Sequence, residues 1–449
     1  MDVVITGVAW VDEAHVTPTI LHAYTYHHPH ELTSFKTYVY SKGRYGFPIG
    51  NKQKFLALFP KANLIDKRIA PHTNKAITLT GLTLRPYQET LLVEILEFFE
   101  SGGTTFNLSG KPSSGKSVLI AAILASLNIK TLVIAHMTLL TTQLFKELSA
   151  ATDANITTLD DKHLELKDVN IATSQFISGR PELWREIKHN IGCIIVDESE
   201  SAGALTMLRI LQRAHAKYRI FVSATFSRSV DNRTEALMDL SGGTIFELVN
   251  PDIIVPSVMM VYCDEQYPRF ISKHTTVKRR QKFFRQDSIA DKVEFLVKKS
   301  LVKNRHILIA VNIQEFQEKL YERLSGYTTV GILNSQTSKS ARDDILQKFD
   351  SGQIKVIIGA AVLNAGLSMP RVSTIIRVAF VSSKEKNVQL VGRALRSFPG
   401  KDGAFIFDLV FRGQNPYGRI QAYKQNGYKV TRHTWSQLEQ ALERQIVDK

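Results

Sequence analysis

The chain has 449 residues, 44% of them hydrophobic and 22% charged, which is enough for two or three globular domains. It contains no apolar run of the ~18 residues needed to cross a membrane, no basic leader at Met1–Ile5, and only two cysteines, too few for a disulfide framework. The scarcity of cysteine fits a reducing compartment, so we expect an intracellular, cytoplasmic protein that binds no membrane. The net charge of +15 favours a polyanionic partner.

Residues 1–80 are rich in Tyr, His, Thr and Pro and show no alternation of strands with helices. They predict a small α+β or β-rich module at the start of the chain. Within it, Lys36–Phe55 interleaves basic with aromatic residues and contains no acidic one, a composition that suits phosphate contact and base stacking. For this segment alone, a solvated surface is the preferred explanation.

The stretch Gly110–Ser117 matches the phosphate-binding pattern G-x-x-x-x-G-K-[ST] and lies between a predicted strand at 104–109 and a predicted helix at 118–127. Backbone N–H groups of such a loop and the helix N-terminus bind the phosphates of a nucleoside triphosphate. Lys116 is expected to meet the β- and γ-phosphates, and Ser117 to bind Mg²⁺. The rest of the predicted cradle comprises Gly110, Ser113, Ser114 and Gly115.

From about residue 81 onward, short apolar runs alternate with helical stretches in two series, which predicts two α/β domains with parallel sheets. We expect domains at 81–252 and 253–449, joined near a proline-flanked segment. The predicted strands are 131–135, 169–173, 193–196 and 219–223 in the first series, and 306–311, 329–333, 355–358, 374–379 and 404–407 in the second.

Asp197 and Glu198 directly follow the apolar strand 193–196, at the strand edge where ligand sites of α/β proteins form. A carboxylate there can reach Mg²⁺ held by Ser117, and a second can polarise the attacking water. We therefore assign Asp197 to the metal and Glu198 to the water. The tripeptide Ser223–Thr225 follows the next predicted strand in the same way.

A second acid-free segment, Lys273–Arg285, holds six basic residues, and a third, Phe411–Arg432, interleaves basic residues with tyrosines. Three such segments in one chain favour nucleic acid as the partner. Lys273–Arg285 could be an inserted loop or hairpin that contacts or splits DNA, or equally a solvated basic helix or linker. Its candidate contact residues are Lys278, Arg279 and Arg280.

The order of these elements resembles that of superfamily 2 helicases over roughly residues 82–410. Leu84–Gln88 (LRPYQ), Gln389–Arg396 (QLVGRALR) and Gly359–Pro370 are similar to three further motifs of that family. The resemblance implies ATP and Mg²⁺ as cofactors, with Arg393 and Arg396 reaching the nucleotide as catalytic residues. It further implies nucleotide contacts by Arg85, Gln88 and Gly366, coupling roles for Ser223, Thr225 and Gln389, and nucleic-acid contacts by His136, Thr173 and Gln175.

Two departures from the family pattern concern the Gly359–Pro370 motif. Its usual Ala-Thr-Asp opening is Gly359-Ala360-Ala361 here, and Ser368 replaces a usual acid, so we expect the coupling of ATP to strand movement to be tuned differently in this chain. The motif Asp197–Glu200 (DESE) also differs from the DEAD form common in RNA helicases, which argues against RNA remodelling.

In its compact length and in its N-terminal module before the motor, the chain resembles the group of XPB, RecG and UvsW. The resemblance is greatest to the phage branch-migration helicases of the UvsW type. The resemblance implies a DNA-recognition role for residues 1–80 and ATP-driven unwinding or branch migration of forked and Holliday-type DNA in replication, recombination or repair. We expect a monomer. The alternatives are an RNA helicase, a duplex translocase subunit that does not separate strands, and a nucleic-acid-binding protein that uses ATP only as a switch.

Overall fold

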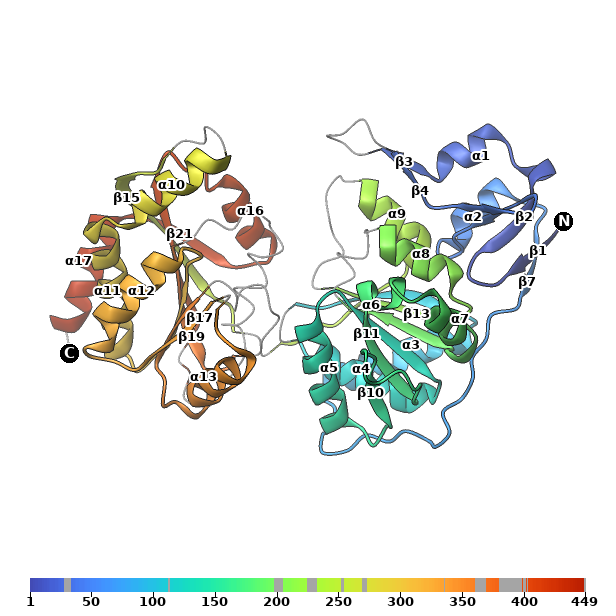
Figure 1. Cartoon of the computed structure of the whole chain (residues 1–449), viewed down its shortest axis with the longest axis horizontal. Coiled ribbons are helices and arrows are strands. Elements are labelled where there is room, and N and C mark those ends of the chain that lie inside the picture. Colours follow the sequence, from blue (N-terminus) through green and yellow to red (C-terminus); the bar gives the residue numbers. More distant parts are fainter. Residues whose placement is uncertain are drawn as a thin grey trace. The chain divides into compact units, whose positions relative to one another are not determined.

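The computed structural model describes residues 1–27, 34–111, 114–197, 205–223, 232–251, 254–268, 273–334, 336–359, 369–378, 398, 401 and 403–447. This part of the chain divides into two compact units, Met1–Asn250 and Pro251–Lys449 (Figure 1). No helix within the described ranges is both long and apolar enough to cross a membrane.

In the first unit, the described residues form a seven-stranded sheet in which every strand pair is parallel. The strand order is β10-β11-β9-β12-β13-β8-β14. The strands are β8 (Thr105–Ser109), β9 (Thr131–Ala135), β10 (Ile156–Thr158), β11 (Val169–Thr173), β12 (Cys193–Val196), β13 (Tyr218–Ser223) and β14 (Ile245–Glu247). The central strands are apolar throughout because helices bury both of their faces.

Two sets of helices cover the two faces of this sheet (Figure 1). One face packs against α3 (Pro86–Glu100), α4 (Lys116–Leu127) and α5 (Thr138–Ala151). The other face packs against α6 (Ser174–Ser178), α7 (Pro181–Asn190), α8 (Leu205–Arg213) and α9 (Asn232–Ser241).

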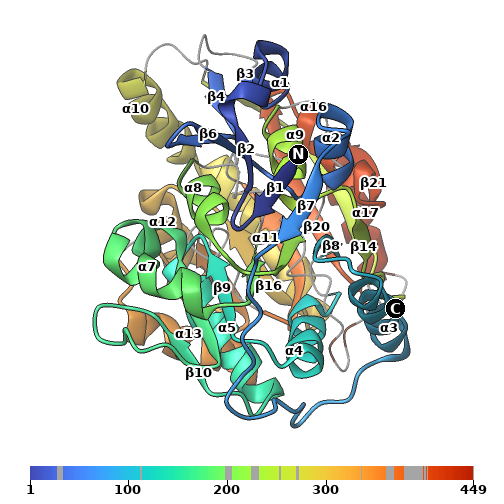
Figure 2. The ribbon, with the colours of Figure 1, turned by 90° about the vertical axis from the view of Figure 1, so that its right-hand side faces the viewer.

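The N-terminal module belongs to the same compact unit and contains a mixed sheet of order β5-β6-β2-β1-β7. Its strands are β1 (Asp2–Ile5), β2 (Ala9–Asp12), β5 (Val39–Ser41), β6 (Arg44–Phe47) and β7 (Asn63–Asp66), and only the β1–β7 pair among these is parallel. Helices α1 (Pro18–Ala23) and α2 (Lys52–Leu58) supply the buried Ile20 and Phe55 to its core. A hairpin of β3 (Thr25–His27) and β4 (Ser34–Lys36) lies beside α9 (Figure 2).

In the second unit, the described strands form another seven-stranded parallel sheet, of order β17-β18-β16-β19-β20-β15-β21. These strands are β15 (Ser257–Gln266), β16 (His306–Ala310), β17 (Val330–Leu333), β18 (Val356–Gly359), β19 (Val372–Arg377), β20 (Phe405–Arg412) and β21 (Lys429–Thr434). One face packs against α10 (Lys273–Phe284), α11 (Asp287–Val302), α12 (Gln314–Ser325) and α17 (Trp435–Val447). The other packs against α13 (Lys339–Ser351) and α16 (Tyr417–Gln425).

The predicted fold class is therefore confirmed: two RecA-like domains with parallel sheets follow a small α+β module. The strands expected in each series are present, with end points shifted by a few residues at most. Four further strands, β10, β14, β15 and β21, were not anticipated from the sequence.

Candidate nucleotide site and nucleic-acid interface

One edge of the first sheet gathers the predicted site residues. Because all strand pairs of this sheet are parallel, the segments that follow β8, β9, β11, β12 and β13 emerge at the same edge. The register pairs Ser223 with Ser109, which places the end of β13 beside the start of the phosphate-binding loop. The backbone N–H of Gly110 donates to the Ser223 carbonyl oxygen over 3.1 Å, so these two motifs are in direct contact.

One glycine of the loop is required by its backbone shape, and a second lies close to the Ser114 hydroxyl. Gly115 has φ +92°, in the left-handed region, and a Cβ there would lie 2.4 Å from Nε2 of Gln88. A Cβ at Gly110 would lie 2.6 Å from the Ser114 hydroxyl oxygen. Helix α4 begins directly after Gly115, so the loop leads into a helix N-terminus that favours an anion.

Polar groups of the loop are held in place for a phosphate. Nζ of Lys116 donates to the Gly110 carbonyl oxygen at 2.6 Å and to that of Lys111 at 3.3 Å. The side-chain oxygen of Ser114 is buried and makes no hydrogen bond within the described part of the chain. A buried hydroxyl without a partner beside a lysine and a helix N-terminus fits the phosphate oxygens of ATP.

The LRPYQ motif supports this loop from the start of α3. Gln88 is 3% exposed, and its Nε2 donates to the Gly115 carbonyl oxygen over 3.3 Å. Its Oε1 accepts from the Arg85 backbone N–H over 3.0 Å, which caps the helix. The hydroxyl of Tyr87 donates to the Ser114 carbonyl oxygen over 3.0 Å, a role that sequence reasoning missed although Tyr87 lies inside the motif. Contacts of Arg85 and Gln88 with the nucleotide remain predictions.

The predicted Mg²⁺ ligands come from two elements of the same sheet edge. Ser117 lies in the first turn of α4, and Asp197 follows β12, where its backbone N–H donates to the Ile134 carbonyl oxygen over 2.9 Å. A hydroxyl and a carboxylate are the hard oxygen donors that Mg²⁺ prefers, so this donor set fits the ion.

Several predicted site residues lie outside the described residues, and their placement stays a prediction. They are Ser113, Glu198, Thr225, Gly366, Gln389, Arg393 and Arg396. Gly359, the first residue of the Gly359–Pro370 motif, is described, and the structure explains why this departure from the family pattern is a glycine. A Cβ at Gly359 would lie 2.2 Å from the Leu333 carbonyl oxygen, so the close approach of β17 to β18 requires glycine there.

The candidate strand-contacting residues also follow strands of the first sheet. His136 comes directly after β9, and Thr173 ends β11. The hydroxyl of Thr173 accepts from the Phe176 backbone N–H over 3.1 Å and so caps α6, whose first turn contains Gln175. Their position at the loop edge is compatible with nucleic-acid contact, although the Thr173 hydroxyl already has this structural role.

The basic segment Lys273–Arg285 is largely the helix α10, and its Phe283 and Phe284 are buried in the core of the second unit. It therefore is not an inserted hairpin. Arg279 is exposed, and the half-buried Arg280 guanidinium lies 5.9 Å from the centre of the Tyr267 ring. Of Lys278 only the backbone is described.

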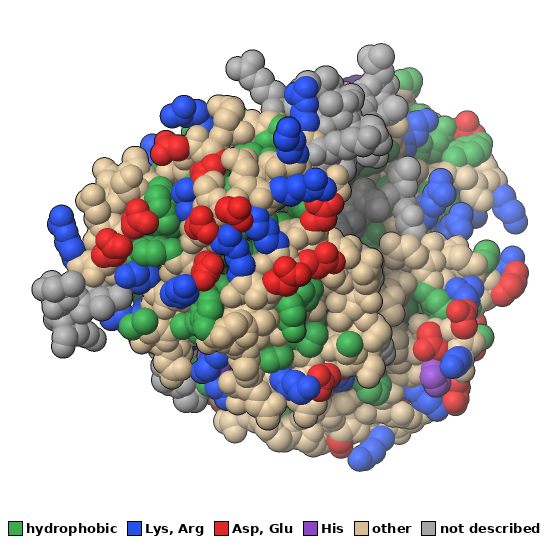
Figure 3. All heavy atoms as spheres, turned by 60° about the vertical axis from the view of Figure 1, so that its left-hand side comes forward, with side chains coloured by type: hydrophobic (Ala, Val, Ile, Leu, Met, Phe, Trp, Pro, Cys, Tyr) green, Lys and Arg blue, Asp and Glu red, His purple; other side chains and the backbone are tan. Residues whose placement is uncertain are grey.

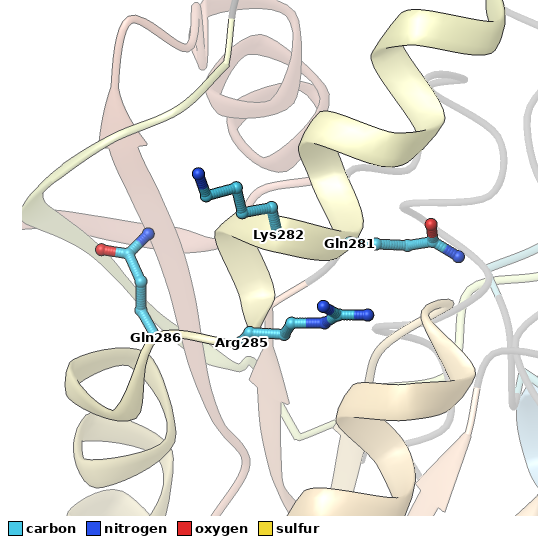
Figure 4. Close-up of a pocket in the computed structure, with 4 residues that line it drawn as sticks. All are labelled: Gln281, Lys282, Arg285 and Gln286. Carbon is cyan, nitrogen blue, oxygen red and sulfur yellow. The ribbon is translucent and has the colours of Figure 1, made fainter.

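A surface pocket of about 550 Å³ lies at the end of α10, lined by Gln281, Lys282, Arg285 and Gln286 (Figure 4). Gln281 and Arg285 extend to one side of the helix end, and Lys282 extends to the other. Arg285 is neutralised by Glu315, whose carboxylate accepts from Nε over 3.0 Å. The face of the molecule drawn in Figure 3 mixes Lys and Arg with Asp and Glu.

The aromatic residues of the other two basic segments are mostly core residues. Phe47, Tyr423 and Tyr428 are buried, and the predicted stacking role is wrong for them. Their spacing reflects the inward faces of strands, which repeat every two residues, and of helices, which repeat every three to four residues. Tyr40, 54% exposed, and Tyr417, 64% exposed, remain accessible to a base.

Two protein-family models match the chain. The model described as "Type III restriction enzyme, res subunit" matches residues 81–228, and "Helicase conserved C-terminal domain" matches residues 291–398. The first match contains the phosphate-binding loop, Asp197 and Ser223, and the second contains Arg393 and Arg396. Both halves of the predicted site therefore fall in helicase-type domains.

The chain is similar to several curated proteins over most of its length. It is 24% identical over 348 residues to "Probable helicase D10" of Escherichia phage T5, covering 75% of each chain. It is 23% identical over 345 residues to the DNA 3'-5' translocase XPB2 of Sulfurisphaera tokodaii, covering 68% of this chain and 77% of that protein. A match to the helicase-named IRC3 of Saccharomyces cerevisiae, 22% identical over 380 residues, covers 76% of this chain but only 53% of IRC3.

Solved structures with the same fold include the DNA-bound restriction-modification enzyme LlaBIII, with TM-score 0.58 and 15% identity over 79% of this chain and 31% of that one. Dbp5 of S. cerevisiae, bound to RNA and ADP BeF3, matches with TM-score 0.53 and 15% identity over 81% of this chain and 98% of that one. At such identities these likenesses show the fold alone. The two family models and the helicase-named relatives, rather than these structures, support an ATP-dependent helicase with domains of the superfamily 2 type, similar to the translocase XPB2 and to phage helicase D10.

Proposed function

We propose that the protein is an ATP-driven DNA motor that unwinds or branch-migrates forked and Holliday-type DNA in replication, recombination or repair. The observation that carries this proposal is the shared edge of the first sheet. There the strands β11, β9, β12, β13 and β8 are consecutive neighbours in the sheet. Thr173 and Ser223 end β11 and β13, whereas His136, Asp197 and the phosphate-binding loop follow β9, β12 and β8. Because the residues for nucleotide and for nucleic acid share one rigid edge, a change at one set during hydrolysis can be transmitted to the other.

Each residue has a defined role in this proposal. ATP supplies the phosphate anhydride that is cleaved, with Mg²⁺ held by Ser117 and Asp197. Lys116 binds the β- and γ-phosphates, and Glu198 orients the attacking water. Arg393 and Arg396, from the domain proposed at 253–449, stabilise the charge of the transition state, and Gln389 and Thr225 couple hydrolysis to the strand-binding segments.

DNA is the favoured substrate for three reasons. The relative XPB2 is named a DNA translocase. The net charge of +15 suits a long polyanion. The module proposed at 1–80 precedes the motor domain proposed at 81–252, where it can hold duplex DNA. The likeness to D10 supports a setting in phage DNA metabolism within the host cytoplasm.

The substrate class is tested by measuring ATP hydrolysis and strand displacement with forked DNA, a four-way junction, linear duplex and single-stranded RNA. We expect forks and junctions to stimulate hydrolysis most and to be unwound, because they offer both a duplex for the N-terminal module and strands for the motor. Stimulation by RNA alone would contradict the proposal.

Translocation along duplex DNA without strand separation is the second candidate. It is favoured by the match of residues 81–228 to the restriction-enzyme model and by the translocase relative. A triplex-displacement assay separates the two candidates. A pure translocase removes the third strand from a duplex but leaves a forked duplex paired, whereas the proposed helicase separates the fork.

Helix α10 is expected to bind DNA phosphates through Arg279 and Lys282, both exposed. For Arg279→Ala or Lys282→Ala, the slope of log affinity against log salt should become shallower by about 1 for each phosphate that the variant no longer binds. Fluorescence anisotropy of labelled fork DNA over a salt series gives this slope. Lys348→Ala on α13 is the matched control, because Lys348 is paired with Asp344 on the opposite face of the sheet. An unchanged slope would identify α10 as a merely solvated helix.

A further inference from the structure

The N-terminal module is joined to the first motor sheet by close contact between backbones. A Cβ at Gly50 would lie 2.0 Å from the Leu240 carbonyl oxygen, and a Cβ at Gly7 would lie 2.2 Å from that of Gln212. Gly50 and Gly7 belong to the module, whereas Leu240 and Gln212 belong to α9 and α8. Glycine at both points lets the two parts touch without intervening side chains.

Between these contacts, the carboxylate of Asp239 on α9 is buried within the module. Its side chain is 2% exposed, and Oδ1 accepts from Nζ of Lys54 at 2.7 Å. Its Oδ2 accepts from the Tyr26 hydroxyl at 2.6 Å and from the Thr37 hydroxyl at 3.3 Å. The Asp239 carbonyl oxygen also accepts from the Asn51 backbone N–H over 3.2 Å. All four partners come from the module, and three of them bind the Asp239 side chain, so one motor residue organises the attachment of the module.

Lys54 makes further contacts within this cluster. Its Nζ also donates to the Tyr26 hydroxyl at 2.8 Å and lies 4.3 Å from the centre of the Tyr24 ring. Burial raises the pKa of Asp239, and the hydrogen bond from Lys54 opposes that rise. Although Lys54 belongs to the basic segment Lys36–Phe55, it is therefore used inside the protein.

The segment directly after α9 contacts β8, the strand that precedes the phosphate-binding loop. The fully buried Nδ2 of Asn107 on β8 donates to the Gly242 carbonyl oxygen at 2.9 Å and to that of Thr244 at 3.1 Å, directly after α9. Asn107 is three residues before Gly110 in the sequence. At its other end, α9 starts at Asn232, shortly after the Ser223–Thr225 motif. Helix α9 thus links the module to the phosphate-binding loop through Asn107, and along the chain to the Ser223–Thr225 motif.

We propose that Lys54 and Asp239 are positioning residues that transmit DNA binding by the N-terminal module to the ATP site through α9 and Asn107. This inference rests on the proposed function, because it requires DNA to be held by the module. Without the ion pair, the module still contacts DNA through its surface, but its position relative to α9 is less tightly fixed. Stimulation of hydrolysis is then lost while binding persists.

The test compares Lys54→Met with wild type in the full chain. Methionine keeps the aliphatic stem and removes only the ammonium group. Basal ATP hydrolysis and the Kd for fork DNA should stay at wild-type levels, whereas the stimulation of kcat by fork DNA should fall about tenfold. Asp239→Asn should have the same effect while keeping an oxygen that accepts from Tyr26, and it serves as a second variant if Lys54→Met unfolds.

Two controls separate positioning from a general structural effect. Lys52→Met makes the same change on an exposed lysine of α2 and should leave stimulation intact, and Lys54→Arg should restore it by keeping the charge. Equal stimulation of Lys54→Met and wild type overturns the inference, as does a loss of DNA affinity that accounts for the whole effect. Failure of every nucleic acid to stimulate wild type instead overturns the proposed function, and this inference with it.

Discussion

Lys116→Ala is expected to lower kcat for nucleic-acid-stimulated ATP hydrolysis by about 10²–10³-fold, the usual cost of removing one preorganised donor from a transition state. The Lys116 ammonium lies 2.6 Å from the Gly110 carbonyl oxygen, within the loop itself. From that position it can reach phosphate oxygens that occupy the loop, and alanine leaves the developing negative charge without this partner.

Lys111→Ala is the matched control for Lys116→Ala. It removes a lysine from the same loop but keeps the backbone carbonyl group that accepts from Lys116. Steady-state turnover at saturating ATP and DNA should therefore stay close to wild type for this control. If Lys116→Ala retained wild-type turnover, the assignment of Gly110–Ser117 as the hydrolytic site would be wrong.

The sheet edge that forms the site was predictable because its signals are local. Apolar runs such as 131–135 and 193–196 are buried on both faces in parallel sheets, and the residues after them must emerge at one edge. The support of the loop by Tyr87 and Gln88 was not predictable from residue types, because it depends on where α3 packs against the loop.

Three of the four missed strands lack the apolar pattern on which strand prediction depends. β10, β14 and β21 lie at sheet edges, where one side is unpaired, and each is short or mostly polar. Tertiary pairing, rather than local propensity, decides these three elements. The fourth, β15, is an inner strand whose apolar run Val258–Cys263 is typical of a buried strand, so its position was predictable from the sequence.

Contacts distant in sequence were also beyond prediction. Asp239 and Lys54 are 185 residues apart, and nothing near either residue signals the pairing. The basic, tyrosine-rich segment Phe411–Arg432 shows the same limit, because its Arg419 and Tyr423 turn inward to a buried acid. A pattern of basic and aromatic residues cannot distinguish a nucleic-acid surface from a helix packed over a buried carboxylate.

That buried acid is Asp408 on β20, which is fully buried beside the equally buried Arg377 of β19. Its Oδ2 accepts from Arg377 Nη1 at 3.1 Å and from the Tyr423 hydroxyl at 2.9 Å. The Arg419 guanidinium lies 3.5 Å from Oδ1. Burial alone would lower the pKa of Arg377, but the Asp408 charge, the Tyr423 hydroxyl and the hydrogen bonds to both together more than offset this, so the pKa of Arg377 lies above its usual value. The cluster thereby joins α16 to the centre of the second sheet.

Asp408→Asn is expected to lower the free energy of unfolding of the second unit by about 3–5 kcal/mol, because it leaves the buried Arg377 charge without its partner. Hydrogen exchange of peptides from β19, β20 and α16, followed by mass spectrometry, should report the destabilisation where it arises. Asp264→Asn is the matched control: Asp264 is 94% exposed and lies 3.8 Å from Arg412, so its removal should cost about 0–1 kcal/mol. Equal protection in the two variants would show that the buried pair contributes no more than a surface one. A selective decrease in protection would show that arginine and tyrosine in Phe411–Arg432 stabilise the second unit rather than bind nucleic acid.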